Sequence, residues 1–169
     1  MPSVAVRTRG WPRSGAYSRA AQKGRVEAIY VSASAGQLPH AVGRVWAAEG
    51  KGLQGDRYFS GIGTWSHYPI ASGRDLTLVE AEVLEEVGLA PAEARRNVVT
   101  RGIALEALLG KRFRVGAAEC YGDRICEPCS HLERLTRPGV PEARRHRGDL
   151  RADITRSGEI AVGDALVPL

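Results

Sequence analysis

The sequence predicts a mainly β fold, a barrel or sandwich with a few short helices. Short apolar or alternating runs of strand length recur along the chain, and glycine-containing turns separate them. Helical spacing is confined to short runs, and the sequence contains no internal repeat. Many short strands combined with small helices are typical of barrels and sandwiches.

The predicted elements follow one another closely. Alternation predicts strands over 26–30 and 42–47 with a loop between them. A strand over 75–79 leads into the clearest helix, 80–87, which has acidic residues at its start and a glycine after its end. A short helix is predicted at 105–109, and further strands at 98–100, 113–115, 117–121, 152–154, 160–162 and 166–167.

The distribution of charge bears on possible partners. The chain has 169 residues, enough for one domain with a buried core. Its net charge of +5 comes from the first 25 residues, which carry six basic side chains and no acid. The rest holds 18 basic and 19 acidic side chains, a charge of −1. Because a nucleic-acid-binding domain carries its positive surface on the folded body, this distribution argues against nucleic acid as a partner.

Residues 1–24 are rich in Arg, Ser, Gly and Ala and show no apolar periodicity. We expect them to form a flexible basic extension, and residues 25–169 to form the folded domain. An acid-free leader of this composition also resembles an organellar transit peptide. No apolar run approaches the roughly 20 residues that span a bilayer, and three cysteines are too few for a disulfide scaffold. A cytoplasmic protein without membrane association is therefore expected.

Three polar segments have the composition of ligand-binding loops. Residues 49–58 contain closely spaced glycines and end in an acid–base pair, so their backbone must turn tightly or approach another group closely; a surface hairpin is the alternative. Residues 59–73 form a long predicted loop of the kind that serves as a lid. Residues 95–97, Arg-Arg-Asn, offer two guanidiniums and an amide that suit an oxyanion such as phosphate; a solvated edge pair is the alternative.

The cysteine-containing stretch runs from 124 to 132. Cys126 and Cys129 have Cys-x-x-Cys spacing, and His131 follows. A thiolate here could carry sulfur or bind a soft metal. Four interpretations are open: a metal half-site, a redox dithiol, a single reactive cysteine, or no function. Cys120 lies in an alternating apolar stretch and is expected to pack in the core.

Five separated motifs occur in an order that matches one family. They are Gly-Leu-Gln-Gly-Asp-Arg at 52–57, Leu-Thr-Leu-Val-Glu at 76–80, Arg-Arg-Asn-Val-Val at 95–99, Cys-x-Pro-Cys with a later leucine at 126–132, and Ser-Gly-Glu-Ile-Ala-Val-Gly-Asp at 157–164. Each motif alone is weak. Together they make residues 25–169 resemble a MOSC domain, named for the C-terminal domain of molybdenum-cofactor sulfurases, in its stand-alone form.

The resemblance implies a β-barrel that binds the molybdenum cofactor, a molybdenum held by a pterin dithiolene with a phosphate tail. Cys129 matches the family's key cysteine, which would ligate molybdenum or carry sulfur as a persulfide. Arg95 and Asn97 match positions that contact the cofactor in amidoxime-reducing relatives. Arg57 and Thr77 stand in matched motifs and are further cofactor-binding candidates.

The function implied is that of a sulfur carrier or a small reductase of N-hydroxylated compounds. Either role would need a partner, a sulfur donor or an electron-donor protein; if the chain is an enzyme, it would be a molybdenum-dependent oxidoreductase or a sulfur transferase. Tyr58 stands where many relatives have histidine, a departure on the substrate side of the site. The alternative is a zinc-binding or thiol-redox module that uses Cys126, Cys129 and His131.

Overall fold

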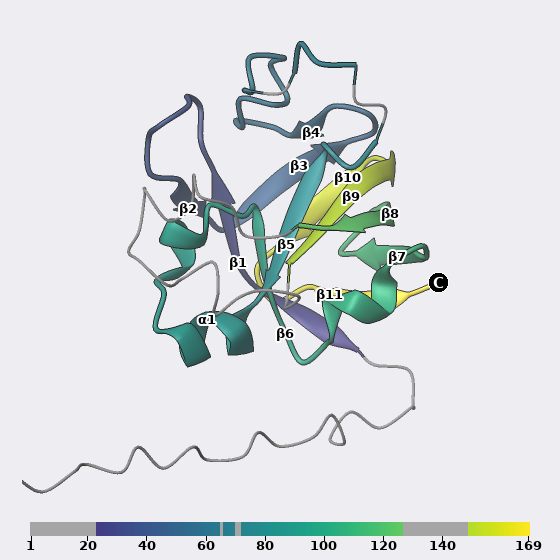
Figure 1. The fold of residues 1–169 in the computed structure, drawn as a ribbon. Coiled ribbons are helices and arrows are strands. Elements are labelled where there is room, and N and C mark those ends of the chain that lie inside the picture. The colour runs from purple at the N-terminus through teal and green to yellow at the C-terminus, as the bar shows by residue number, and fades with distance from the viewer. Residues whose placement is uncertain (1–22, 65, 70–71, 127–148) are drawn as a thin grey trace, which may run out of the picture.

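Seven strands close into a barrel in the computed structural model, which describes residues 23–64, 66–69, 72–126 and 149–169 (Figure 1). The ring closes because its first and last strands pair with each other. In spatial order the barrel strands are β11 (Ala165–Pro168), β7 (Arg112–Val115), β8 (Ala118–Ile125), β9 (Asp149–Arg156), β5 (Leu76–Glu80), β6 (Val98–Arg101) and β1 (Gly24–Val31). The predicted mainly β barrel is confirmed.

A second, smaller sheet lies beside the barrel. It contains β10 (Gly158–Ala161), β3 (Arg44–Ala48) and β4 (Gly52–Leu53). The prediction of one strand over 42–47 was wrong, since β2 (His40–Val42) pairs with β1 in the barrel sheet whereas β3 pairs with β10. Gly43 stands between them, and its carbonyl accepts a hydrogen bond from Val162 at 2.9 Å, so the chain passes from one sheet to the other at a residue without a side chain.

The barrel interior is filled by the inward-facing residues of each strand. In β7, Phe113 and Val115 are fully buried whereas Arg112 and Arg114 are exposed, which is the alternation that the sequence shows. The main core cluster draws on all seven barrel strands and on β3, β4 and β10. The interior of the barrel is thus a packed core, and a ligand must bind at its ends or outside it.

The single parallel pair of the barrel, β5 with β6, needs a crossover connection. It consists of α1 (Ala81–Val87) and the 3-10 turn η1 (Pro91–Ala94). These pack against Val79 and Val99, which face away from the interior, and form a second core cluster. The connection therefore covers the outer face of the barrel and delivers residues 95–97 to the start of β6.

Several strands are longer than predicted, among them β8 and β9. β8 continues to Ile125, four residues beyond its predicted end, and β9 begins at Asp149, three residues before its predicted start. Asp149 can begin a buried strand because Arg96 neutralises its carboxylate at 2.7 Å. The other short helix, η2 (Leu105–Leu108), forms as a 3-10 turn where a helix was predicted. In the described part of the chain, no helix has the length and apolar character needed to cross a membrane.

Gly122, in the middle of β8, allows η2 to pack against the barrel. A Cβ atom at this position would overlap the carbonyl group of Leu108. Gly122→Ala is therefore expected to lower the free energy of unfolding by about 1–3 kcal/mol, the usual cost of overpacking. Gly43→Ala is the matched control, because a Cβ atom there meets nothing within 4 Å. Urea denaturation of both variants measures the difference, and equal stabilities would contradict the packing argument.

Candidate anion-binding site

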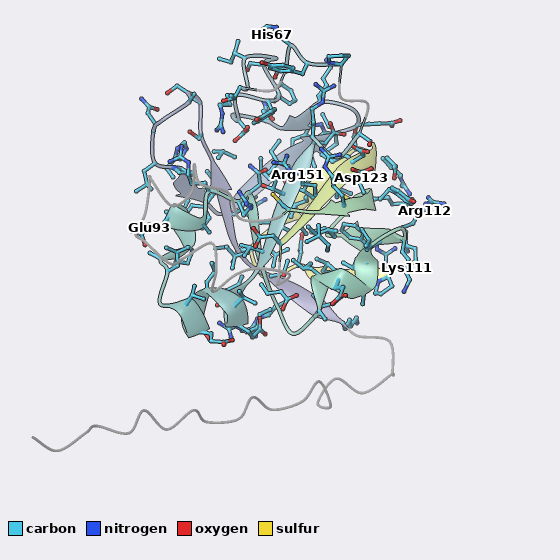
Figure 2. All side chains as sticks on the ribbon, in the orientation of Figure 1. His67, Glu93, Lys111, Arg112, Asp123 and Arg151 are labelled. Carbon is cyan, nitrogen blue, oxygen red and sulfur yellow. The ribbon has the colours of Figure 1, made fainter. Side chains whose placement is uncertain are left out.

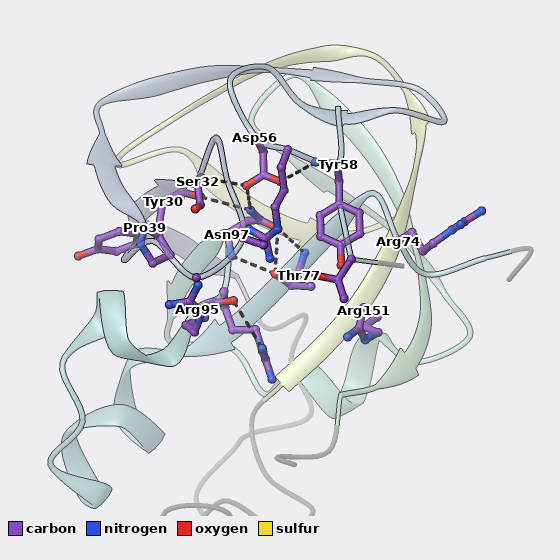
Figure 3. A pocket seen from close by; sticks show the side chains of 15 residues that line it. Tyr30, Ser32, Pro39, Asp56, Tyr58, Arg74, Thr77, Arg95, Asn97 and Arg151 are labelled. Carbon is purple, nitrogen blue, oxygen red and sulfur yellow. Dashed lines mark hydrogen bonds between the residues drawn. The ribbon is translucent and has the colours of Figure 1, made fainter. Parts of the chain in front are cut away.

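A cavity of about 380 Å³ lies where the barrel strands meet two loops (Figure 3). Its wall comes from the end of β1, the starts of β5 and β9, and the segment that precedes β6. The loops of 32–39 and 56–64 complete it. Among the described lining residues one is an acid, Asp56, and five are basic: Arg57, Arg74, Arg95, Arg96 and Arg151. We call this cavity the arginine pocket.

The carboxylate of Asp56 is occupied by hydrogen bonds from the chain itself. Asp56 is 5% exposed, and its Oδ2 accepts from the backbone N–H of Ser32 at 3.1 Å. Its Oδ1 accepts from the N–H of Tyr58 at 3.0 Å, and Asn97 Nδ2 donates to Oδ2 at 3.4 Å. Asp56 thus joins the loop after β1 to its own loop and to the segment before β6. It makes no ion pair with any of the described arginines of the pocket.

Thr77 and Asn97, both predicted from the sequence to bind cofactor, lie together in the pocket wall and bond to each other. Asn97 Oδ1 accepts from the Thr77 hydroxyl at 2.9 Å and from the Thr77 N–H at 3.2 Å. The Asn97 N–H donates to the Thr77 carbonyl at 3.0 Å. The remaining amide group, Asn97 Nδ2, faces the carbonyl of Tyr30 at 3.3 Å as well as Asp56. These polar groups hold the wall in shape.

Arg57 and Arg95, also predicted, bring two positive charges together. The Arg57 Nε is buried without a hydrogen-bond partner, and its guanidinium carbon lies 5.1 Å from the centre of the Tyr58 ring. Arg95 donates from Nη2 to the carbonyl of Gln37 at 2.8 Å. Burial lowers the pKa of Arg95, and the charge of Arg57 lowers it further. An anion bound between the two guanidiniums would relieve that repulsion.

The backbone of Arg95 adds to this arrangement. Its φ of 56° makes it the one non-glycine residue with a positive φ in the described part of the chain. For a residue with a side chain this conformation costs on the order of 1 kcal/mol. It closes the 3-10 turn η1, with the Arg95 N–H donating to the carbonyl of Ala92 at 3.1 Å. This left-handed backbone conformation turns the chain so that the Arg95 side chain lines the pocket.

The remaining arginines differ in their partners. Arg96 is paired with Asp149, which is 1% exposed, so its charge is largely compensated. Arg74 donates to the carbonyl of Tyr68 at 3.0 Å and points away from the group around Asp56 in Figure 3. Arg151, opposite Thr77 in the β5–β9 pair, has no ion pair with any other described residue. Sequence reasoning missed Arg151, because only strand register brings it beside Thr77.

Two of the three cysteines, Cys120 and Cys126, lie within the described residues. Cys129 and His131 lie outside the described residues. Cys126 directly follows β8, is buried, and donates its N–H to the carbonyl of Asp149 at 3.2 Å. Cys120 is a core residue, as predicted, and burial together with the nearby Asp75 raises its thiol pKa to about 12. Within the described residues no group of three or more His, Cys, Asp or Glu side chains could hold a metal ion.

The loop over 59–73 extends from the arginine pocket. Among the described residues of this loop, Thr64 lines the arginine pocket. His67 is exposed at the outer end of this loop, far from the labelled Arg151 in Figure 2. The imidazole of His67 therefore lies away from the arginine pocket.

Comparisons with known proteins identify the fold independently. The family model described as MOSC domain matches residues 63–167. The YuaD protein from Bacillus subtilis has a similar structure, with a TM-score of 0.66, 18% sequence identity, and coverage of 85% of this chain and 94% of that one. YiiM from Geobacillus stearothermophilus gives a TM-score of 0.63 at 16% identity, with coverage of 86% and 75%. YiiM from Escherichia coli gives 0.58 at 19% identity, with coverage of 86% and 69%. No curated protein matches the sequence.

Proposed function

This chain belongs to the MOSC domain family, and from that premise we propose that it binds the molybdenum cofactor, with the phosphate tail in the arginine pocket and Cys129 as the sulfur-bearing residue. One observation carries the proposal. Arg57, Arg95 and Arg151 line a single cavity, and none of them makes an ion pair with a described carboxylate. A cavity that gathers uncompensated positive charge is suited to an anionic group.

The donor set fits a phosphate. A guanidinium offers planar, paired N–H groups that match phosphate oxygens, and such charge-assisted bonds are stronger than neutral ones. The buried Nε of Arg57 is an unsatisfied donor, which costs free energy until an acceptor reaches it. A phosphate oxygen would supply that acceptor. The chain's own carboxylate in the pocket does not, because Asp56 is turned toward Ser32, Tyr58 and Asn97.

The position of Cys126 supports the role of Cys129. Cys126 bonds to the backbone of Asp149, whose carboxylate holds Arg96 in the pocket wall. Cys129 follows Cys126 by three residues, and three residues of extended chain span at most about 10 Å. A thiolate is a soft ligand, suited to a sulfur-liganded metal.

The bound cofactor would supply a molybdenum centre able to exchange oxygen or sulfur. The chain's residues would do the rest. Arg57, Arg95 and Arg151 would neutralise the phosphate and fix the orientation of the ligand, while Asn97 and Thr77 keep the wall rigid. Cys129 would hold the metal or a transferable sulfur. A sulfur carrier and a small reductase of N-hydroxylated compounds would use the same two elements and differ in the partner, a sulfur donor or an electron-donor protein.

Replacing Arg57 tests the proposal. Arg57→Ala should weaken binding of ribose 5-phosphate, a compact phosphate monoester, by roughly 10- to 100-fold, because a charge-assisted contact contributes about 1.5–3 kcal/mol. Cofactor retained after expression in a molybdenum-replete host, measured as molybdenum and oxidised pterin, should fall in parallel. Arg114→Ala is the control, because Arg114 is exposed on β7 and does not line the pocket, so this substitution removes the same charge elsewhere. Equal losses in the two variants would reject the arginine pocket as the anion site.

A further inference from the structure

A second cavity, of about 480 Å³, adjoins the arginine pocket. Its walls come from the turn at 49–51, from Gly61 and Ser66, and from the last half of β9. The two cavities share two described residues, Tyr58 and Arg74. In Figure 3 the Tyr58 ring stands between the group formed by Asp56, Asn97 and Thr77 and the side chain of Arg74. The ring is therefore a partition between two spaces that would otherwise join.

Several contacts fix the position of Tyr58. The Tyr58 N–H donates to Asp56 Oδ1 at 3.0 Å, and its carbonyl accepts from Gly61 at 3.1 Å. The ring packs directly on Gly63, where an added Cβ atom would lie 2.5 Å from ring carbons. On another side lies the guanidinium of Arg57, 5.1 Å from the ring centre. The contact between a cation and an aromatic ring is attractive, so ring and guanidinium stabilise each other's position.

The two cavities differ in charge. The arginine pocket contains the uncompensated guanidiniums, whereas the charged side chains around the second cavity are mixed: three acids, Glu49, Asp75 and Asp153, and two bases, Lys51 and Arg74. Asp75 and Asp153 are fixed by backbone N–H groups, Asp75 by that of Ile154 at 3.0 Å and Asp153 by that of Gly73 at 2.6 Å. A ligand with a phosphate among the arginines would thus meet the aromatic ring of Tyr58 if it continued in this direction.

We propose that Tyr58 is a specificity-determining residue of the anion site. Its ring ends the arginine pocket, so that the pocket admits a terminal phosphate monoester and excludes an internal diphosphate that carries a further group beyond the phosphates. This inference rests on the proposed function, because it takes the arginine pocket as the anion site. It selects the cofactor form that ends in a single phosphate over the form extended by a nucleotide.

A matched pair of ligands tests the partition without any cofactor. Ribose 5-phosphate ends in a phosphate monoester, and ADP-ribose contains the same unit joined through a diphosphate to adenosine. By isothermal titration calorimetry the wild type should bind ribose 5-phosphate at least tenfold more tightly than ADP-ribose. In Tyr58→Ala the two affinities should come within about threefold of each other, mainly because ADP-ribose binds more tightly. Tyr58→Phe keeps the ring and should keep the wild-type ratio.

The outcomes separate the two proposals. If Arg57→Ala loses ribose 5-phosphate but Tyr58→Ala keeps the wild-type ratio, the partition is wrong and the anion site stands. If the wild type binds neither ligand, both proposals fall. Tyr58→Leu retains an apolar side chain of smaller size, and it replaces Tyr58→Ala should thermal melting show that the alanine variant does not fold. An unchanged ligand ratio in the leucine variant would also overturn the inference.

Discussion

Cys129→Ser is expected to remove nearly all bound molybdenum or cyanide-releasable sulfur and to leave the melting temperature within about 2 °C of wild type. Serine replaces a soft, polarizable sulfur with a hard oxygen that stays protonated near neutral pH. The volume of the side chain changes little, so the chemistry should be lost while the fold survives. Metal analysis, cyanolysis and thermal melting measure the three quantities on one preparation.

Cys126 supplies the matched control. Because Cys126 is buried, serine there would bury a hydroxyl group, and Cys126→Ala is the cleaner change. It should retain most of the molybdenum or sulfur. A dithiol redox module predicts that either substitution stops turnover. A structural zinc site predicts that both release metal and lower the melting temperature together. Parallel loss in both variants would therefore favour the zinc or thiol-redox alternative over the proposed role.

The sequence predicted the strands correctly where buried and exposed residues alternate along the strand. Phe113 and Val115 in β7 face inward, as the alternation indicates. Prediction failed where a distant residue decides the outcome. Asp149 begins a buried strand because Arg96 neutralises it, and those two residues are 53 positions apart. The chain changes sheets at Gly43, and the local pattern of apolar residues cannot reveal which partner strand each half will find.

The motifs that line the candidate site could be found in the sequence, but the hydrogen-bond and ion-pair partners of their side chains could not. Arg57, Thr77, Arg95 and Asn97 line one cavity, and their binding of a cofactor stays a prediction. Sequence could not show that the amide of Asn97 is occupied by Thr77 and Tyr30. It also could not separate Arg95, which has no described acidic partner, from the adjacent Arg96, which has one, because the acid responsible lies in another strand. Which arginine is left to bind an anion depends on its ion-pair partners, and those partners meet only in the closed barrel.

Asp56→Ala is expected to be the most disruptive change in the pocket wall, lowering the free energy of unfolding by about 2–4 kcal/mol and weakening ribose 5-phosphate binding. The carboxylate satisfies two backbone N–H groups, those of Ser32 and Tyr58, and the side chain of Asn97. A buried donor left without an acceptor costs about 1–3 kcal/mol. With both N–H groups released, the loops that carry Arg57 and the segment after β1 would lose their common anchor.

Asp56→Asn distinguishes this anchoring role from an electrostatic one. Asparagine keeps one acceptor oxygen and the shape of the side chain but removes the charge, so stability and ligand affinity should fall between those of wild type and Asp56→Ala. If Asp56 mainly offsets the charge of the arginines, both substitutions should instead strengthen binding, since the pocket becomes more positive in each. Glu159→Ala is the control, because its pair with Arg44 is exposed and contributes little. Urea denaturation and calorimetric titration of the four proteins decide between the roles, and tighter binding by Asp56→Asn would contradict the anchor.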